Sequence, residues 1–146
     1  MSEMNLHLTP QEQVWRLWDK EEIKDLMNRY AYYTANDERR RCITELWVST
    51  EENRRTASMG YNNGYYVGLD NILGHYVSDC YDQRMENLRA YHAQKGVDLC
   101  EQNLGYGASF VHTLNTPYIE IAGDGQTAKY IGYDCGLYCI GSPDGS

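Results

Sequence analysis

The chain has 146 residues, of which 42 % are hydrophobic and 23 % charged, a composition typical of one globular domain. Its formal net charge is −8 and its pI about 4.9, which argues against nucleic acid or an anionic membrane as a partner. No run approaches the ~20 apolar residues of a membrane span, and residues 1–5 lack the features of a secretory signal, so we expect a cytoplasmic protein.

Cysteine and tyrosine usage adds two expectations. The five cysteines form no Cys-x-x-Cys pair, so we expect reduced thiols and no metal site. Fourteen tyrosines stand against one phenylalanine. Because tyrosine joins an apolar body to a hydroxyl, a chain rich in it can line a pocket that is apolar but still donates hydrogen bonds.

The first third of the chain has helical patterns. Thr9 to Glu12 has the form of a capping box with Pro10 at the first helical position, which predicts a helix start. Asp19 is a candidate cap for a second helix, and Asp37 for a third. One stripe of the second helix recurs at intervals of three and four residues and comprises Ile23, Leu26, Met27, Tyr30 and Tyr33. The third helix is expected to bury Ile43, Leu46 and Trp47, and Trp15 and Trp18 are expected to pack in the interior.

The middle of the chain predicts a hairpin and another helix. Residues 54–59 and 65–67 have strand character around the turn signal at 61–64. Asp70 is a candidate cap for a helix that buries Ile72 and Tyr76 and continues toward Leu88. Gly96 is its predicted stop.

From residue 106 the pattern changes to strands, predicted at about 107–115, 117–122 and 127–140. Residues 122–126 predict a tight turn between the last two strands. Helices followed by a strand meander predict an α+β fold, with helices on one face of a mostly antiparallel sheet, in a single domain over residues 1–146. Residues 142–145 form a turn signal with no returning strand, which predicts a sheet completed by another subunit along the edge near 138–146.

His112 is the most informative residue of the predicted strands. Its neighbours on the same strand face are Phe110 and Leu114, so an ionisable imidazole stands on an apolar surface. Such a residue is either a hydrogen-bonded core histidine or the acid–base group of a pocket.

Three features together resemble the SnoaL-like branch of the nuclear transport factor 2-like superfamily. They are Arg29-Tyr30 on a helix, His112 four residues before Thr116-Pro117, and the strand and turn at 119–129. The resemblance runs from about Trp15 to the C-terminus. It implies a cone-shaped, curved antiparallel sheet with helices packed on its concave face. The sequence has no counterpart of the last two strands. Relatives include scytalone and bile-acid 7-alpha-dehydratases, ketosteroid isomerases, polyketide cyclases and binding proteins.

The resemblance also implies site residues. Tyr30 and His112 match the tyrosine and histidine that face each other across the dehydratase pocket. The family's aspartate after the tyrosine falls on Ala35 here, with Asp37 as a substitute. Its third-strand acid aligns with Gly136, with Asp134 nearby.

Two functions are therefore expected to compete. The first is a cofactor-independent lyase or isomerase acting on a small apolar, cyclic or polyketide-like substrate, with Tyr30, His112, Asp37 and Asp134 as catalytic candidates. The second is a non-catalytic ligand-binding or assembly module, which the departures at Ala35 and Gly136 favour. In either case we expect a homo-oligomer, a dimer or trimer, with no organic cofactor. The candidate ligand-binding residues are Tyr33, Asn36, Phe110, Asn115 and Tyr133.

Overall fold

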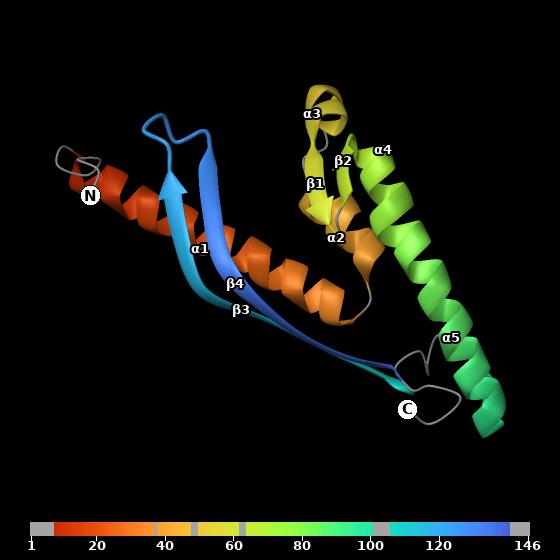
Figure 1. The fold of residues 1–146 in the computed structure, drawn as a ribbon. Helices are drawn as coiled ribbons and strands as arrows, with labels where there is room; N and C mark the ends of the chain where they lie inside the picture. The colour runs from red at the N-terminus through yellow and green to blue at the C-terminus, as the bar shows by residue number, and fades with distance from the viewer. Residues whose placement is uncertain (1–7, 37, 48–49, 62–63, 101–105, 141–146) are drawn as a thin grey trace.

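A computed structural model describes residues 8–36, 38–47, 50–61, 64–100 and 106–140 (Figure 1). Its helices precede its two long strands, which confirms the α+β class. The elements are α1 (Pro10–Ala35), α2 (Arg39–Leu46), α3 (Glu51–Thr56), β1 (Ser58–Tyr61), β2 (Gly64–Val67), α4 (Leu69–Ile72), η1 (Leu73–Asp79), α5 (Cys80–Lys95), β3 (Ala108–Ile121) and β4 (Ala128–Ile140).

Helix α1 begins as the sequence predicts. The Thr9 hydroxyl accepts from the Glu12 backbone N–H at 3.3 Å, and the Glu12 carboxylate accepts from the Thr9 backbone N–H at 2.7 Å. The prediction of a new helix at Asp19 is wrong, because α1 runs unbroken for 26 residues. No glycine or proline follows Pro10 within it, so nothing in the chain interrupts the helix at that point.

The expected packing of Trp15 and Trp18 is also wrong. Their side chains are 60 % and 66 % exposed, and the Trp18 indole N–H donates to Glu22 one turn further along α1. Burial is confined to the C-terminal part of this helix, where Ala31 and Tyr33 lie in the interior. A regular spacing of apolar residues therefore predicted the helix but not which of its turns are covered.

The region around the first hairpin is predicted in part. β1 and β2 pair antiparallel, with Tyr61 opposite Gly64, while turn residues 62–63 lie outside the described ones. Residues 54–56 were expected in a strand but belong to α3, because the Thr50 hydroxyl caps this helix by accepting from the Asn53 N–H at 3.3 Å.

Helix α4, the π-helical segment η1 and helix α5 follow one another without a break from Leu69 to Lys95. The predicted cap at Asp70 is wrong: Gly68 is the N-cap residue, with φ of 88°, and Asp70 lies in the first turn. Gly96 ends α5 with φ of 68°, a left-handed conformation that glycine adopts without strain. Among the described residues, no helix has both the length and the apolar character that crossing a membrane requires.

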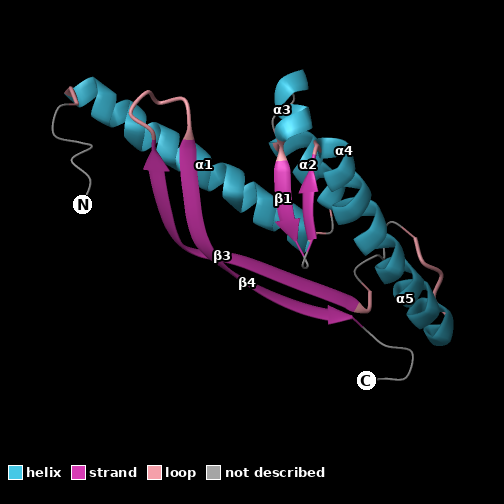
Figure 2. Ribbon diagram, turned by 45° about the horizontal axis from the view of Figure 1, so that its top comes forward, coloured by secondary structure: helices cyan, strands magenta, loops and turns pink. Residues whose placement is uncertain are grey.

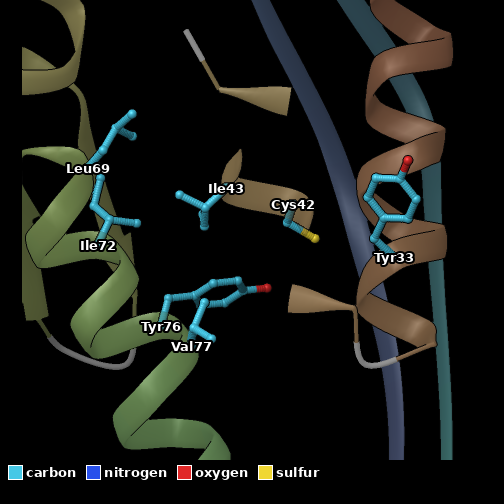
Figure 3. Close-up of a cluster of buried hydrophobic side chains, with 7 residues drawn as sticks. All are labelled: Tyr33, Cys42, Ile43, Leu69, Ile72, Tyr76 and Val77. Carbon is cyan, nitrogen blue, oxygen red and sulfur yellow. The ribbon is translucent and has the colours of Figure 1, made fainter. Parts of the chain in front are cut away.

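A compact cluster of buried side chains joins α1, α2, α4 and η1. Ile43 and Ile72 are almost fully buried, and Figure 3 shows Tyr76 beside them with its hydroxyl directed toward α1. The other members of this cluster are Tyr33, Cys42, Leu69 and Val77, and Tyr30, Leu46 and Trp47 pack against it.

The long strands β3 and β4 form an antiparallel hairpin. Its turn is confirmed, since the Gly125 N–H donates to the Ala122 carbonyl at 3.0 Å and the Gln126 N–H to the Asp124 carboxylate at 2.9 Å. Two strands were expected to meet at Pro117, but β3 is one strand with a register shift between Asn115 and Tyr118. The bulge accommodates a proline that has no N–H for the ladder, and Thr116 takes φ of 50° there.

The hairpin crosses α1 and continues past the C-terminal end of that helix toward the end of α5 (Figures 1 and 2). One side, the α1-facing side, carries the buried Ile119 and Ile121. The opposite, outer side carries Val111, Ile131 and Leu137, each close to or above half exposed. The described strands form two separate two-stranded sheets. They do not form the cone-shaped sheet that the resemblance implied.

Candidate functional site

His112 and Asp134 lie together on the α1-facing side of the hairpin. The register pairs His112 with Gly136 and Leu114 with Asp134, so the aspartate is the diagonal neighbour of the histidine. The distance from His112 Nδ1 to Asp134 Oδ2 is 3.4 Å. This is an ion-pair distance without hydrogen-bond geometry, and Nδ1 has no hydrogen-bond partner among the described residues.

Gly136 makes room for the imidazole. A Cβ added there would lie 3.5 Å from Cε1 and 3.7 Å from Nε2 of His112, so the ring lies directly over this residue. The resemblance implied an acid at the position of Gly136. In this chain Asp134, two residues earlier on the same side of β4, brings a carboxylate to the histidine instead.

Tyr30 reaches the same part of the molecule from α1. Its hydroxyl lies 3.4 Å from that of Tyr76 in η1, and either oxygen can be the donor. Burial, the neighbouring Tyr76 and, to a smaller extent, the negative charge of Asp134 raise the pKa of Tyr30 far above its ordinary value. Asp134 thus contacts His112, and its charge has a small effect on Tyr30.

Tyr76 and Arg39 are functional candidates that the sequence did not reveal. Burial raises the pKa of Tyr76, and the Arg39 guanidinium lies 5.4 Å from the centre of its ring. Tyr76 belongs to the π-helical segment η1, and such segments occur frequently at functional sites. The sequence marked Tyr76 only as a core residue, because its contact with Tyr30 joins positions 46 residues apart.

Two of the remaining candidates lie at the end of α1. The Tyr33 hydroxyl donates to Glu45 at 2.9 Å and accepts from Arg41 at 2.9 Å, so it is held by α2. The hydrogen bond to Glu45 is the main cause of the raised pKa of Tyr33. Asn36 is the exposed C-cap residue of α1, and Asp37 lies outside the described residues.

The other candidates belong to the hairpin. Asn115 and Tyr133 are register partners on its outer side, where both are exposed, and Tyr133 is 77 % exposed. Phe110 pairs with Tyr138 on the same strand face as His112, but its side chain lies outside the described ones. The structure therefore brings Tyr30, His112 and Asp134 to one region and places Asn115 and Tyr133 away from it.

In the part of the chain that the structure describes, no cluster of three or more His, Cys, Asp or Glu residues is placed to hold a metal ion. Comparisons with protein-family models, with curated proteins and with solved structures find no match for this chain. The chemistry of the site must therefore be argued from its own geometry.

Proposed function

We propose that the chain is a cofactor-independent lyase or isomerase of the SnoaL-like type. Its substrate would be a small apolar carbonyl compound, cyclic or polyketide-like. The observation that carries the proposal is the His112–Asp134 pair at 3.4 Å on the α1-facing side of the hairpin, with Tyr30 close enough to feel the Asp134 charge. A histidine beside a carboxylate and near a buried phenol supplies the groups that proton transfer next to a carbonyl requires.

In the proposed reaction His112 is the base and then the acid. Its neutral imidazole removes the proton α to the substrate carbonyl, and the electron pair of that C–H bond forms an enolate. The imidazolium then protonates the β-hydroxyl as the enolate collapses, so water leaves and an enone remains. Asp134 orients the imidazole and stabilises its charged form, and the 3.4 Å contact is expected to shorten when substrate binds.

Tyr30 and Tyr76 have the complementary role of holding the enolate oxygen. Both phenols are protonated at neutral pH, and a hydroxyl of this pair turns from its present partner to donate to the enolate oxygen. Arg39, 5.4 Å from the Tyr76 ring centre, adds a positive charge on the side where negative charge develops. One donor to a developing enolate oxygen is worth about 10²–10³-fold in rate.

The test is turnover of a panel of β-hydroxy-ketones by the wild type and by His112→Ala, Asp134→Asn and Tyr30→Phe. We expect a loss of about 10²–10⁴-fold for His112→Ala, since it removes the acid–base group. Thr113→Ala is the matched control: it lies next to His112 but on the outer side, and its activity should stay within about 2-fold of the wild type. Equal rates in the wild type and His112→Ala would refute the proposed reaction.

A second candidate is a non-catalytic ligand-binding or assembly module of the same type. The observation that favours it is the packing of Tyr30 against the buried cluster, with its hydroxyl satisfied by Tyr76. In that case no hydroxy-ketone is turned over by any of the five proteins, while ligand binding survives in His112→Ala.

The proposal extends to assembly. In the described residues β3 and β4 pair only with each other, so each keeps an unpaired edge, and Val111 and Leu137 on the outer side are exposed. We take this hairpin to be part of a larger curved sheet of the cone type, completed in a cytoplasmic dimer or trimer. Light scattering should give a mass of two or three chains at micromolar concentration, and a monomer would contradict this part of the proposal.

A further inference from the structure

A cavity lies away from His112, at the other end of the β3–β4 hairpin. It is an open cavity of about 440 Å³ between the first half of α1 and the end of β3. Its apolar wall includes Leu17, Ile119 and Ile121, and its charged groups are Arg16, Lys20 and Glu120. Fourteen residues of α1 separate Arg16 from Tyr30, which is about 21 Å along a helix with a rise of about 1.5 Å per residue. The cavity is therefore distinct from the proposed catalytic site.

The positive charge of this cavity is fixed in place. The two terminal nitrogens of Arg16 donate to the carbonyls of Ala122 and Gly123, at 2.5 and 2.8 Å, so the guanidinium is anchored to the turn of the hairpin. Lys20 follows one helical turn later on the same face of α1. These bonds use backbone carbonyls, and the carboxylate that interacts with Arg16 along α1, Glu12, does not line the cavity.

Glu120 only partly offsets these two cations. Its Oε1 atom accepts from the Tyr118 hydroxyl at 2.6 Å, and it pairs in register with Lys129 across the hairpin. With Arg16 and Lys20 positive and Glu120 negative, the cavity lining carries a net charge of +1 in a chain whose overall charge is −8. A local positive site in an acidic protein selects for an anion.

The apolar wall defines the rest of the ligand. Ile119 and Ile121 are only 8 % and 9 % exposed, and they form the floor on the α1-facing side of the hairpin. We propose that the cavity binds a small amphipathic anion, a carboxylate on an apolar chain or ring, whose head group lies at Lys20 and Arg16. Its apolar body lies against Leu17, Ile119 and Ile121. The volume is in the range of cavities that hold small ligands.

The experiment is calorimetric titration of the full chain with three probes of equal length below their micelle concentrations: decanoate, decan-1-ol and decyltrimethylammonium. The wild type should bind one decanoate saturably and the other two at least about 10-fold more weakly. Lys20→Ala should weaken decanoate binding by about 5–10-fold, since it removes the less constrained cation. Lys24→Ala is the control, because Lys24 lies on the same helix, pairs with Glu21 at 2.5 Å and does not line the cavity.

Leu17→Asp provides an independent test. This residue is 65 % exposed, so the helix tolerates the change, while the new carboxylate should repel the probe and abolish binding. The proposal is overturned if decan-1-ol binds as tightly as decanoate, or if Lys20→Ala and Lys24→Ala behave alike. These outcomes leave the hydroxy-ketone assay untouched, so the failure of one site is distinguishable from the failure of the other.

Discussion

The buried cluster and the β3–β4 hairpin are built on opposite principles. In the cluster, side chains from α1, α2, α4 and η1 converge, and Ile43 and Ile72 have almost no exposed surface. The hairpin is covered on one side only: Ile119 and Ile121 are buried, whereas Ile131 and Leu137 are 49 % and 62 % exposed. The side chains of the cluster are therefore covered by several elements, whereas the hairpin has one covered side and one exposed side.

The comparison between the cluster and the hairpin shows where polar functional groups can lie in this fold. A polar group inside the cluster must be satisfied, as the Tyr30 and Tyr76 hydroxyls are by each other. On the hairpin a polar group can lie at the boundary, as His112 and the half-exposed Asp134 do. The proposed site combines a hydrogen-bonded phenol pair of the interior with a histidine–carboxylate pair at the edge of the sheet.

The largest expected effect on stability comes from a substitution within the buried cluster. Ile72→Ala should lower the free energy of unfolding by about 2–5 kcal/mol, because it leaves a cavity among fully packed neighbours. Ile131→Ala, on the outer side of the hairpin, should cost no more than about 0.5 kcal/mol. Urea denaturation measures both. Similar losses in the two variants would mean that the cluster and the hairpin do not differ as described.

The next effect tests the attachment of the hairpin to α1. Arg16→Ala removes two charge-assisted hydrogen bonds to the turn and should cost about 1–3 kcal/mol of unfolding free energy. Arg29→Ala serves as the control, since Arg29 is exposed and pairs with Asp25 within α1 at 3.2 Å; it should cost less than about 0.5 kcal/mol. If the two variants lose the same stability by thermal denaturation, the attachment is not energetically important.

Alkaline pH should reveal the buried phenols. The raised pKa of Tyr30 means that above about pH 10 the unfolded chain releases this proton while the folded chain keeps it. The contribution of the Tyr30 hydroxyl to the free energy of unfolding is therefore fully present at neutral pH. As pH rises past 10, this contribution falls by up to about 1.4 kcal/mol per pH unit. Tyr30→Phe should show a shallower loss between pH 10 and 11 in urea titrations. Identical slopes would place the Tyr30 hydroxyl in water.

The smallest effect concerns the start of α1, away from the buried cluster. Thr9→Ala should cost about 1 kcal/mol, because the Glu12 N–H loses its capping acceptor. Thr9→Ser keeps the hydroxyl and should be close to neutral. A loss of the same size in Thr9→Ser, measured by thermal unfolding, would show that the methyl group and not the cap is responsible.

Local signals in the sequence predicted local structure well. The capping box at Thr9 and the turn after β3 depend on residues within five positions of one another, and both are confirmed. The hairpin of β1 and β2 is confirmed as a strand pairing, although residues 54–56 are helical. The predictions were wrong where the structure depends on contacts between residues that are far apart in the sequence. Trp15 and Trp18 have helical spacing, but no described element covers them, and the break expected at Pro117 becomes a bulge because β4 pairs on both sides of it.

The candidate site shows the same division. His112 and Asp134 were each identified from the sequence, but their proximity depends on the register that sets Leu114 opposite Asp134. A shift of one residue would turn either side chain to the outer side. Tyr76 and Arg39 could not be found in this way, because only the tertiary fold brings η1 and α2 to Tyr30.

The central claim is that Tyr30, Asp134 and His112 serve one small ligand. It is tested most directly by NMR titration with 4-nitrophenolate, a planar anion that mimics an enolate. We predict that the His112 imidazole and Tyr30 ring signals shift together with a single dissociation constant, that Asp134→Asn changes this constant, and that Lys20→Ala leaves it unchanged. If either the His112 or the Tyr30 signal stays fixed at saturation, the two side chains do not share a site and the claim is contradicted.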